Sequence, residues 1–176
     1  MLAMLVMMQT DAIKELAGVK NKLESALIKE ASSKIEINTL VRKFSKSGQS
    51  REIILMLDPE HVINRNHILA AYSNAVFSFH DNENISKNIG IETMLFMSFT
   101  KQIKDAIAIS GAKDNSHFIL FCSSTPALKK AQRYVRIKKE FYPSKKEQAH
   151  AAKQLGLKSY SAGSLLYKMA SLKLSD

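Results

Sequence analysis

Apolar positions in the first third of the chain fall into two kinds of pattern. The run "MLAMLVMM" is apolar throughout, which is typical of a buried strand. Leu16, Leu23 and Leu27 recur at helical spacing and indicate an amphipathic helix. The pattern predicts these elements in order: a strand over Met1–Met8, a helix from Thr10 or Asp11 to about Ala31, a strand over Lys34–Asn38, a polar loop over Lys46–Ser50, and a buried strand over Arg51–Asp58.

The rest of the chain predicts helices around one central strand. Gly111 is expected to end a helix in the left-handed conformation, and Ser144 with Glu147 has the sequence of a capping box. The predicted helices are His67–His80, Ile91–Thr100, Lys101–Ser110, a basic helix from Ser123–Thr125 to about Ile137, one from Ser144 to Gly156, and Ala162–Leu174; the predicted strand is His117–Cys122.

Strands and helices that follow each other without strict alternation predict an α/β (α+β) fold with a small mixed sheet packed with several helices. The length of 176 residues fits a single domain over residues 1–176. Hydrophobic residues make up 45% of the chain, which is enough to form a core and argues against disorder throughout.

The excess of basic residues indicates the kind of partner that the protein binds. Lys and Arg outnumber Asp and Glu by 26 to 16, so the net charge of +10 favours an anionic partner, and nucleic acid is the commonest large one. The cations concentrate in one segment, with Tyr134, Phe141 and Tyr142 interleaved. Its basic residues are Lys129, Lys130, Arg133, Arg136, Lys138, Lys139, Lys145 and Lys146. This segment either tracks phosphates and stacks bases, or is a solvated helix face with its aromatic residues packed inward.

The sequence carries no recognisable catalytic chemistry. It has neither a phosphate-binding glycine loop nor a GxSxG motif, and no histidine is spaced to preform a metal site. Asp58 and Glu60 are typical of a turn and helix start, and Glu92 is expected to have a structural role on its apolar helix. We therefore expect no catalytic residue, no metal and no cofactor.

Two features of the sequence bear on where in the cell the protein is found. Cys122 is a single cysteine, which cannot form an internal disulfide and suits the reducing cytoplasm. The apolar start of the chain is eight residues long, whereas a membrane-spanning helix needs about 20, so no membrane is expected as a partner.

The order of several short motifs resembles one protein family. These motifs are the D-x-x-x-V turn from Asp58 to Val62, the helix containing His67, Leu69 and Ala71, Ile91-Glu92 at the start of an apolar helix, S-x-x-K-Q-I-x-x-A-I-x-x-x-G from Ser98 to Gly111, and the closing "LLYKMASLKL". Together they resemble the small kinase-binding regulatory subunits of the KEOPS complex. Lys101 stands where that family is expected to carry arginine.

The resemblance implies a non-catalytic subunit that binds the small kinase/ATPase of KEOPS and the 3′ CCA end of tRNA, without a small-molecule substrate. The complex makes threonylcarbamoyl adenosine at tRNA position 37, and another subunit carries the chemistry. The tRNA-binding candidates are Thr100, Lys101, Gln102, Ile103, Lys129, Lys130, Arg133 and Arg136. The kinase-interface candidates are Phe96, Met97, Leu166 and Leu174, which lie off the main apolar stripes of their helices.

Two other interpretations stay open on the sequence. One is a stand-alone basic RNA-binding protein with no kinase partner. The other is a small enzyme whose site the sequence does not reveal.

Overall fold

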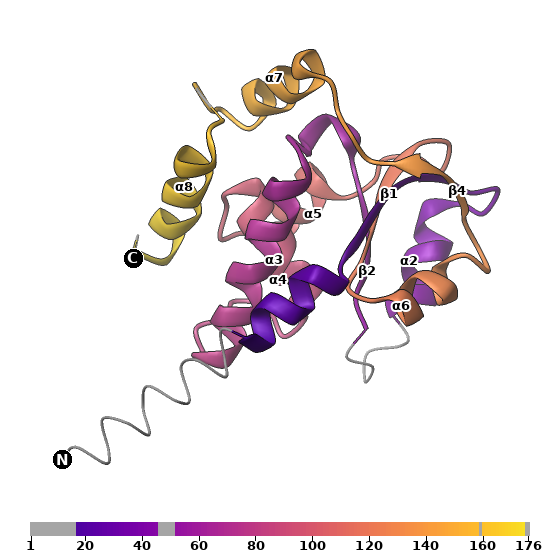
Figure 1. The fold of residues 1–176 in the computed structure, drawn as a ribbon, viewed down its shortest axis with the longest axis horizontal. Helices are drawn as coiled ribbons and strands as arrows, with labels where there is room; N and C mark the ends of the chain where they lie inside the picture. Colours follow the sequence, from indigo (N-terminus) through magenta and orange to yellow (C-terminus); the bar gives the residue numbers. More distant parts are fainter. Residues whose placement is uncertain (1–16, 46–51, 159, 175–176) are drawn as a thin grey trace.

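The structure is a computed structural model that describes residues 17–45, 52–158 and 160–174. Its sheet has four strands in the order β2-β3-β1-β4, and the three pairings are all antiparallel. The strands are β1 (Leu27–Ser32), β2 (Ile54–Leu57), β3 (Phe118–Cys122) and β4 (Arg136–Glu140). The predicted α/β class, a small sheet packed with several helices, is confirmed (Figure 1). The predicted strand over Met1–Met8, the predicted start of the first helix and the predicted loop over Lys46–Ser50 lie outside the described residues.

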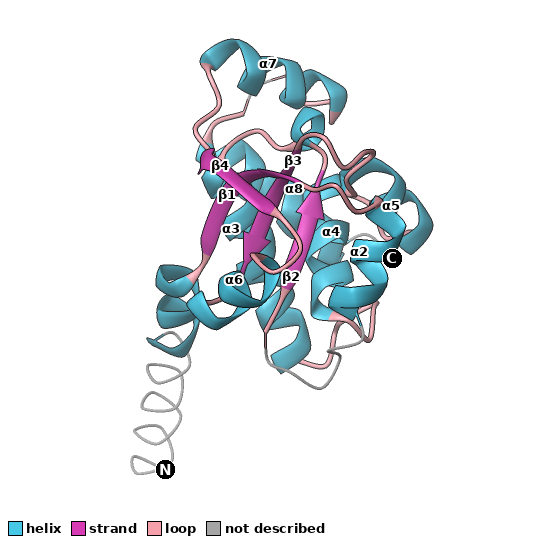
Figure 2. Cartoon of the chain, turned by 90° about the vertical axis from the view of Figure 1, so that its right-hand side faces the viewer, coloured by secondary structure: helices cyan, strands magenta, loops and turns pink. Residues whose placement is uncertain are grey.

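Helices surround the sheet on both faces (Figures 1 and 2). Residues 17–25 are helical at the start of the described chain. The other helices are α2 (Ile37–Ser45), the short 3-10 helix η1 (Pro59–His61), α3 (Arg65–His80), α4 (Ile89–Ser98), α5 (Ile103–Ser110), α6 (Thr125–Ala131), α7 (Lys145–Gln154) and α8 (Ala162–Leu174).

The central strand β3 shows why the sheet needs helices on both sides. All five of its residues are buried, and they alternate between two cores. Ile119 and Phe121 pack with α3 and α4, whereas Phe118, Leu120 and Cys122 pack with α2 and α6. A strand buried on both faces is a continuous apolar run, which is the pattern that its sequence shows. Figure 2 looks onto the side of the sheet that carries α2 and α6.

The last two helices pack on the α3 side of the molecule. Leu165 and Met169 are buried along one side of α8, and Leu165 joins a third apolar cluster with Ile63 and with α7. The ammonium group of Lys168 donates to the carbonyl oxygen of Leu155 at 3.2 Å, which ties α8 to the end of α7.

Several sequence predictions are confirmed in detail. The strand β3 and the helices α3 and α8 lie where the patterns placed them, with shifts of a few residues at the ends. Ser144 and Glu147 form the predicted capping box of α7. Gly156 follows that helix with a φ of 67°, the left-handed conformation expected at such a stop.

The prediction of one helix as far as Ala31 is wrong. The first helix ends at residue 25, and Leu27–Ser32 forms β1 between β3 and β4. The segment "LIKEAS" consists largely of residues that tolerate a helix, and no glycine or proline separates it from the helix before it. Pairing with two neighbouring strands outweighs that local preference.

The strand predicted over Lys34–Asn38 is also wrong, because α2 begins at Ile37. The signal that was missed is the helical spacing of Ile37, Leu40 and Phe44, three residues that contribute to the core on the α2 side.

The basic helix predicted as far as Ile137 is shorter than expected. It ends as α6 at Ala131, and after a turn the chain continues as β4. Val135 and Ile137 pack on the same core at strand spacing, which explains why this part pairs with β1 instead of extending the helix.

Gly111 follows α5 for a reason other than the predicted one. Its φ is −72° and its ψ is 143°, so it is extended and not left-handed. A Cβ atom at this position would lie 2.6 Å from the carbonyl oxygen of Ile107. Glycine is therefore needed for close approach of the backbone, where residues 110–112 run beside the outer edge of β2.

Candidate functional site

The sharp turn between α4 and α5 shapes the first candidate site. Phe99 follows α4 with a φ of 52° and a ψ of 41°, the left-handed conformation, which is uncommon for a bulky residue and costs roughly 1–2 kcal/mol. The N–H of Thr100 donates to the carbonyl oxygen of Leu95 at 3.2 Å, which satisfies one carbonyl at the end of the helix. The turn directs residues 100–102 away from α4 and into the start of α5.

Aromatic and cationic contacts hold Phe99 in this conformation. Its ring stacks on the imidazole of His67, with ring centroids 5.7 Å apart and an angle of 25° between the planes. The ammonium group of Lys168 lies 4.9 Å from the centre of the Phe99 ring. The core therefore supports a backbone conformation that would be unfavourable in isolation.

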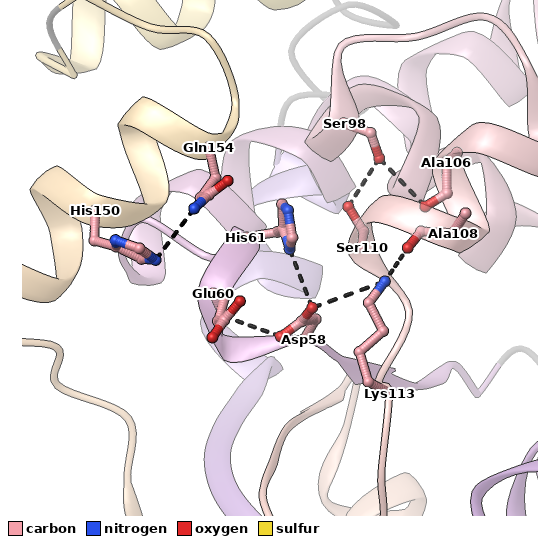
Figure 3. A network of polar contacts seen from close by, with 10 residues as sticks. All are labelled: Asp58, Glu60, His61, Ser98, Ala106, Ala108, Ser110, Lys113, His150 and Gln154. Atoms are coloured by element: carbon pink, nitrogen blue, oxygen red, sulfur yellow. Dashed lines mark hydrogen bonds and ion pairs between the residues drawn. The ribbon is translucent and has the colours of Figure 1, made fainter.

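Two buried serines fix α5 against α4. The hydroxyl oxygens of Ser98 and Ser110 lie 2.8 Å apart (Figure 3). The Ser98 hydroxyl also donates to the carbonyl oxygen of Met94 at 2.7 Å. Ser98, which begins the S-x-x-K-Q-I motif, is thus a structural residue that positions the motif.

The residues between these helices present a polar helix start. The Thr100 hydroxyl oxygen accepts a hydrogen bond from the N–H of Gln102 at 3.1 Å. Gln102 occupies the N-cap position of α5 but makes no side-chain cap, so its side chain does not satisfy the N–H groups that open this helix. Ile103 is 38% exposed at the first helical position. The structure brings these three candidates together with Lys101 at one turn.

Thr100 and Lys101 line a hollow of about 260 Å³. The hollow is bounded by the end of α3, the loop after it, α4 and α8, and its other lining residues are Ser78, Glu83, Ile85, Glu92, Leu95, Phe96 and Leu172. It therefore combines one cation and two carboxylates with an apolar wall. Such a lining provides for both a charged and an apolar part of a ligand.

Glu92 has the structural role that the sequence predicted. Its carboxylate is buried and accepts hydrogen bonds from the N–H groups of Ile85, at 3.3 Å, and Ser86, at 2.8 Å. These bonds hold the loop between α3 and α4 against α4 and so fix one wall of the hollow.

The basic candidates do not join this site. Lys129 and Lys130 lie on α6, Arg133 in the turn that follows, and Arg136 at the start of β4. Helix α6 packs on the face of the sheet opposite to α3 and α4, whereas Thr100 and Lys101 lie on the α3–α4 side. The eight tRNA-binding candidates therefore form two separate groups.

The kinase-interface candidates also divide. Phe96 is 4% exposed and Met97 is 0% exposed, so both belong to the core, and the prediction that they face a partner is corrected. Neighbouring helices cover the second apolar side of α4. Leu166 is 52% exposed on α8, next to Tyr167 at 79%, which the sequence analysis missed. Leu174 ends α8, but its side chain lies outside the described part.

A second polar network surrounds Asp58 (Figure 3). Its carboxylate accepts from the N–H of Glu60 at 3.1 Å, lies 3.1 Å from Nδ1 of His61 and lies 3.8 Å from the ammonium group of Lys113. The Lys113 ammonium also donates to the carbonyl oxygen of Ala108. This network fixes η1 beside the end of α5, in agreement with the predicted turn and helix start. Among the described residues no group of three His, Cys, Asp or Glu side chains is arranged to hold a metal ion.

Comparison with known proteins gives one informative result. No individual curated protein matches the chain. Within the described residues, no helix has both the length and the apolar character needed to cross a bilayer. Residues 16–155 match the family described as "Kinase binding protein CGI-121". This match covers well over half of the sequence and confirms the resemblance found in its motifs, and the chain therefore belongs to the CGI-121 family of kinase-binding proteins.

Proposed function

We propose that this protein is a non-catalytic regulatory subunit of the KEOPS complex, which binds the small kinase/ATPase of that complex and supports threonylcarbamoyl adenosine modification at tRNA position 37. The observation that carries the proposal is the match of residues 16–155 to a family of kinase-binding proteins. The motifs at the α4–α5 turn and in the closing helix resemble those of KEOPS subunits. This resemblance supports the assignment to KEOPS and to its tRNA substrate.

The outer side of α8 is the best candidate for the kinase surface. Leu166 and Tyr167 are large side chains that are exposed there, while Leu165 and Met169 anchor the opposite side of the helix in the core. Aromatic and aliphatic side chains on a rigid helix are typical anchors of a protein interface.

The start of α5 is the best candidate for the tRNA 3′ end. Its opening N–H groups and Lys101 offer donors and a positive charge to phosphates. A single-stranded end suits such a site, because its bases are exposed and its backbone is flexible.

The exposed carboxylate of Glu83 in the same hollow suits the bases of a CCA end. Cytosine and adenine carry exocyclic amino groups that donate hydrogen bonds, and carboxylates accept such bonds. Glu83 is exposed at the rim of the hollow, and a carboxylate can accept more than one hydrogen bond. Lys101 and Glu83 together therefore offer complementary contacts to a phosphate and to an amino group.

Reconstitution tests this function. The other KEOPS subunits are assayed for modification of tRNA with and without this chain, and the chain is assayed alone. We expect the chain to co-purify with the kinase, to raise the rate of modification and to have no activity by itself. Tight tRNA binding without co-purification and without stimulation would instead favour a stand-alone RNA-binding protein.

A further inference from the structure

Five cations lie on α2, on α6 and in the turn after α6, on the face of the sheet that these two helices cover. We call this the basic face, and its members are Arg42, Lys43, Lys129, Lys130 and Arg133. The two from α2 were not candidates on the sequence, because the helix that carries them was not predicted. All five side chains are exposed or partly exposed.

The packing beneath them places α2 beside the turn that follows α6. The rings of Phe44 and Tyr134 meet edge to face with centroids 6.0 Å apart. The ammonium group of Lys43 lies 4.8 Å from the centre of the Tyr134 ring. Phe44, Ala127 and Ala131 belong to the same buried cluster, so α2 and α6 share one core.

The charge of the basic face is not neutralised within the described part of the chain. No ion pair joins any of its five cations to a carboxylate there. Two neighbouring cations of β4 are different: Lys139 lies 3.3 Å from the carboxylate of Glu30, and Lys138 donates to the carbonyl oxygen of Ser116. The face therefore offers its positive charge to a partner.

We propose that the basic face binds the phosphate backbone of double-stranded RNA, at a site separate from the start of α5. Dispersed cations on a folded surface suit a polyanion, whose bound counterions they release. This inference shares with the proposed function only the premise that RNA is a partner of this chain.

The aromatic residues near the basic face, Tyr134, Phe141 and Tyr142, favour contact with the RNA backbone over stacking on bases. Phe141 is buried in the core, and the Tyr134 ring is occupied by Phe44 and Lys43. Neither offers a free face to an unpaired base, as a surface for single strands would. Tyr142 is exposed, but its ring lies 5.9 Å from the guanidinium group of Arg65 on α3, which packs on the other side of the sheet.

The same surface is poorly suited to a membrane. Val41 is the one large hydrophobic residue of α2 that is exposed, and the described residues of α6 and β4 contribute none. A membrane-binding helix needs an apolar side that inserts among the lipids. Phosphates of a duplex need only cations at the surface, and these contacts position the protein without reading sequence.

The experiment uses a blunt-ended RNA hairpin, which has no single-stranded 3′ end and so does not probe the start of α5. Binding is measured against salt for the wild type, for the double variant Lys129→Gln/Arg133→Gln and for the charge-matched control Lys22→Gln/Lys153→Gln. The control positions are exposed, on the first helix and on α7. Thermal unfolding of each variant establishes that it is folded.

We expect the logarithm of the binding constant to fall with the logarithm of salt concentration, by about 0.9 for each phosphate contact. In the double variant this slope should be shallower by about 2, and the affinity at low salt should fall at least about tenfold. The control should have the slope and the affinity of the wild type. Lys101→Ala should bind the hairpin as the wild type does, so failure of the 3′-end site leaves this result unaffected.

Three outcomes would overturn the proposal. Equal losses in the double variant and the control would mean that only net charge matters. Tighter binding to vesicles of anionic lipid, or to a single strand of the same length, would assign the face to another ligand. Absence of hairpin binding would mean that the cations form an ordinary solvated surface.

Discussion

The imidazole of His67 donates a hydrogen bond from Nε2 to the carbonyl oxygen of Met97, at 3.1 Å, and so joins the start of α3 to the end of α4. Its Nδ1 accepts from the N–H of Ile63 at 3.3 Å. Because that N–H can only donate, Nδ1 carries no proton and Nε2 does. Both ring nitrogens of this buried, neutral histidine are thereby used, and its ring supports Phe99 at the turn that leads to the candidate RNA site.

This arrangement predicts a loss of stability in mild acid. Burial lowers the pKa of His67 from 6.5 to about 4, so the unfolded chain binds this proton more readily than the folded chain does. His67 makes its full contribution to the free energy of unfolding above pH 6.5. This contribution, about 3 kcal/mol, is lost as the pH falls towards 4. Denaturant unfolding between pH 4 and 7 measures it.

A non-titrating replacement provides the control for this effect. His67→Gln should lower stability at pH 7 but flatten its dependence on pH, whereas His150→Gln on the exposed side of α7 should leave the dependence unchanged. A His67→Gln protein with the same slope as the wild type would show that other groups cause the acid sensitivity.

Gly111→Ala should destabilise the protein by about 1–3 kcal/mol, because the new methyl group would lie 2.6 Å from a backbone oxygen that cannot move freely. Gly18→Ala is the matched control. It lies in a helix with no atom within 4 Å of the new Cβ, so it should be neutral or stabilising by up to about 1 kcal/mol. Thermal unfolding of both variants checks the pair, and a tolerated Gly111→Ala would contradict the close approach.

Glu92→Gln should destabilise the protein by about 2 kcal/mol, since an amide keeps one acceptor oxygen and turns a donor towards the second N–H. Hydrogen exchange at the amides of Ile85 and Ser86 should accelerate while exchange in β3 stays slow. Unchanged protection of these two amides would mean that the loop holds its position without the carboxylate.

Leu166→Glu should abolish co-purification with the kinase and leave the fold intact, because this side chain is exposed on α8. Met97→Glu should instead unfold the protein, because it would bury a charge in the core. Circular dichroism and co-purification of both variants separate the two effects. A Leu166→Glu protein that still binds the kinase would remove the outer side of α8 from the interface.

Local signals made parts of the fold predictable. The continuous apolar run of β3 and the capping box of α7 depend on residues next to each other in sequence, and both were predicted correctly. The strand β1 was missed because its identity depends on pairing with β3 and β4, which are remote in sequence.

The candidate site was predictable only in part, for a similar reason. The polar turn at Thr100 and Lys101 follows from local sequence. Its separation from Lys129 depends on which face of the sheet each helix covers, and the burial of Met97 depends on its neighbours in the tertiary structure. No periodicity within one helix carries this information.

The most direct test of the account is a comparison of tRNA with and without its terminal CCA, each measured with the wild type and with Lys101→Ala; Lys153→Ala on α7 serves as control. If the start of α5 holds the 3′ end, Lys101→Ala should weaken binding of intact tRNA by about 1–2 kcal/mol, the scale of one charge-assisted hydrogen bond, and should matter much less for tRNA lacking CCA. Equal losses on both tRNAs, or no loss on either, would contradict the assignment of this turn as the 3′-end site.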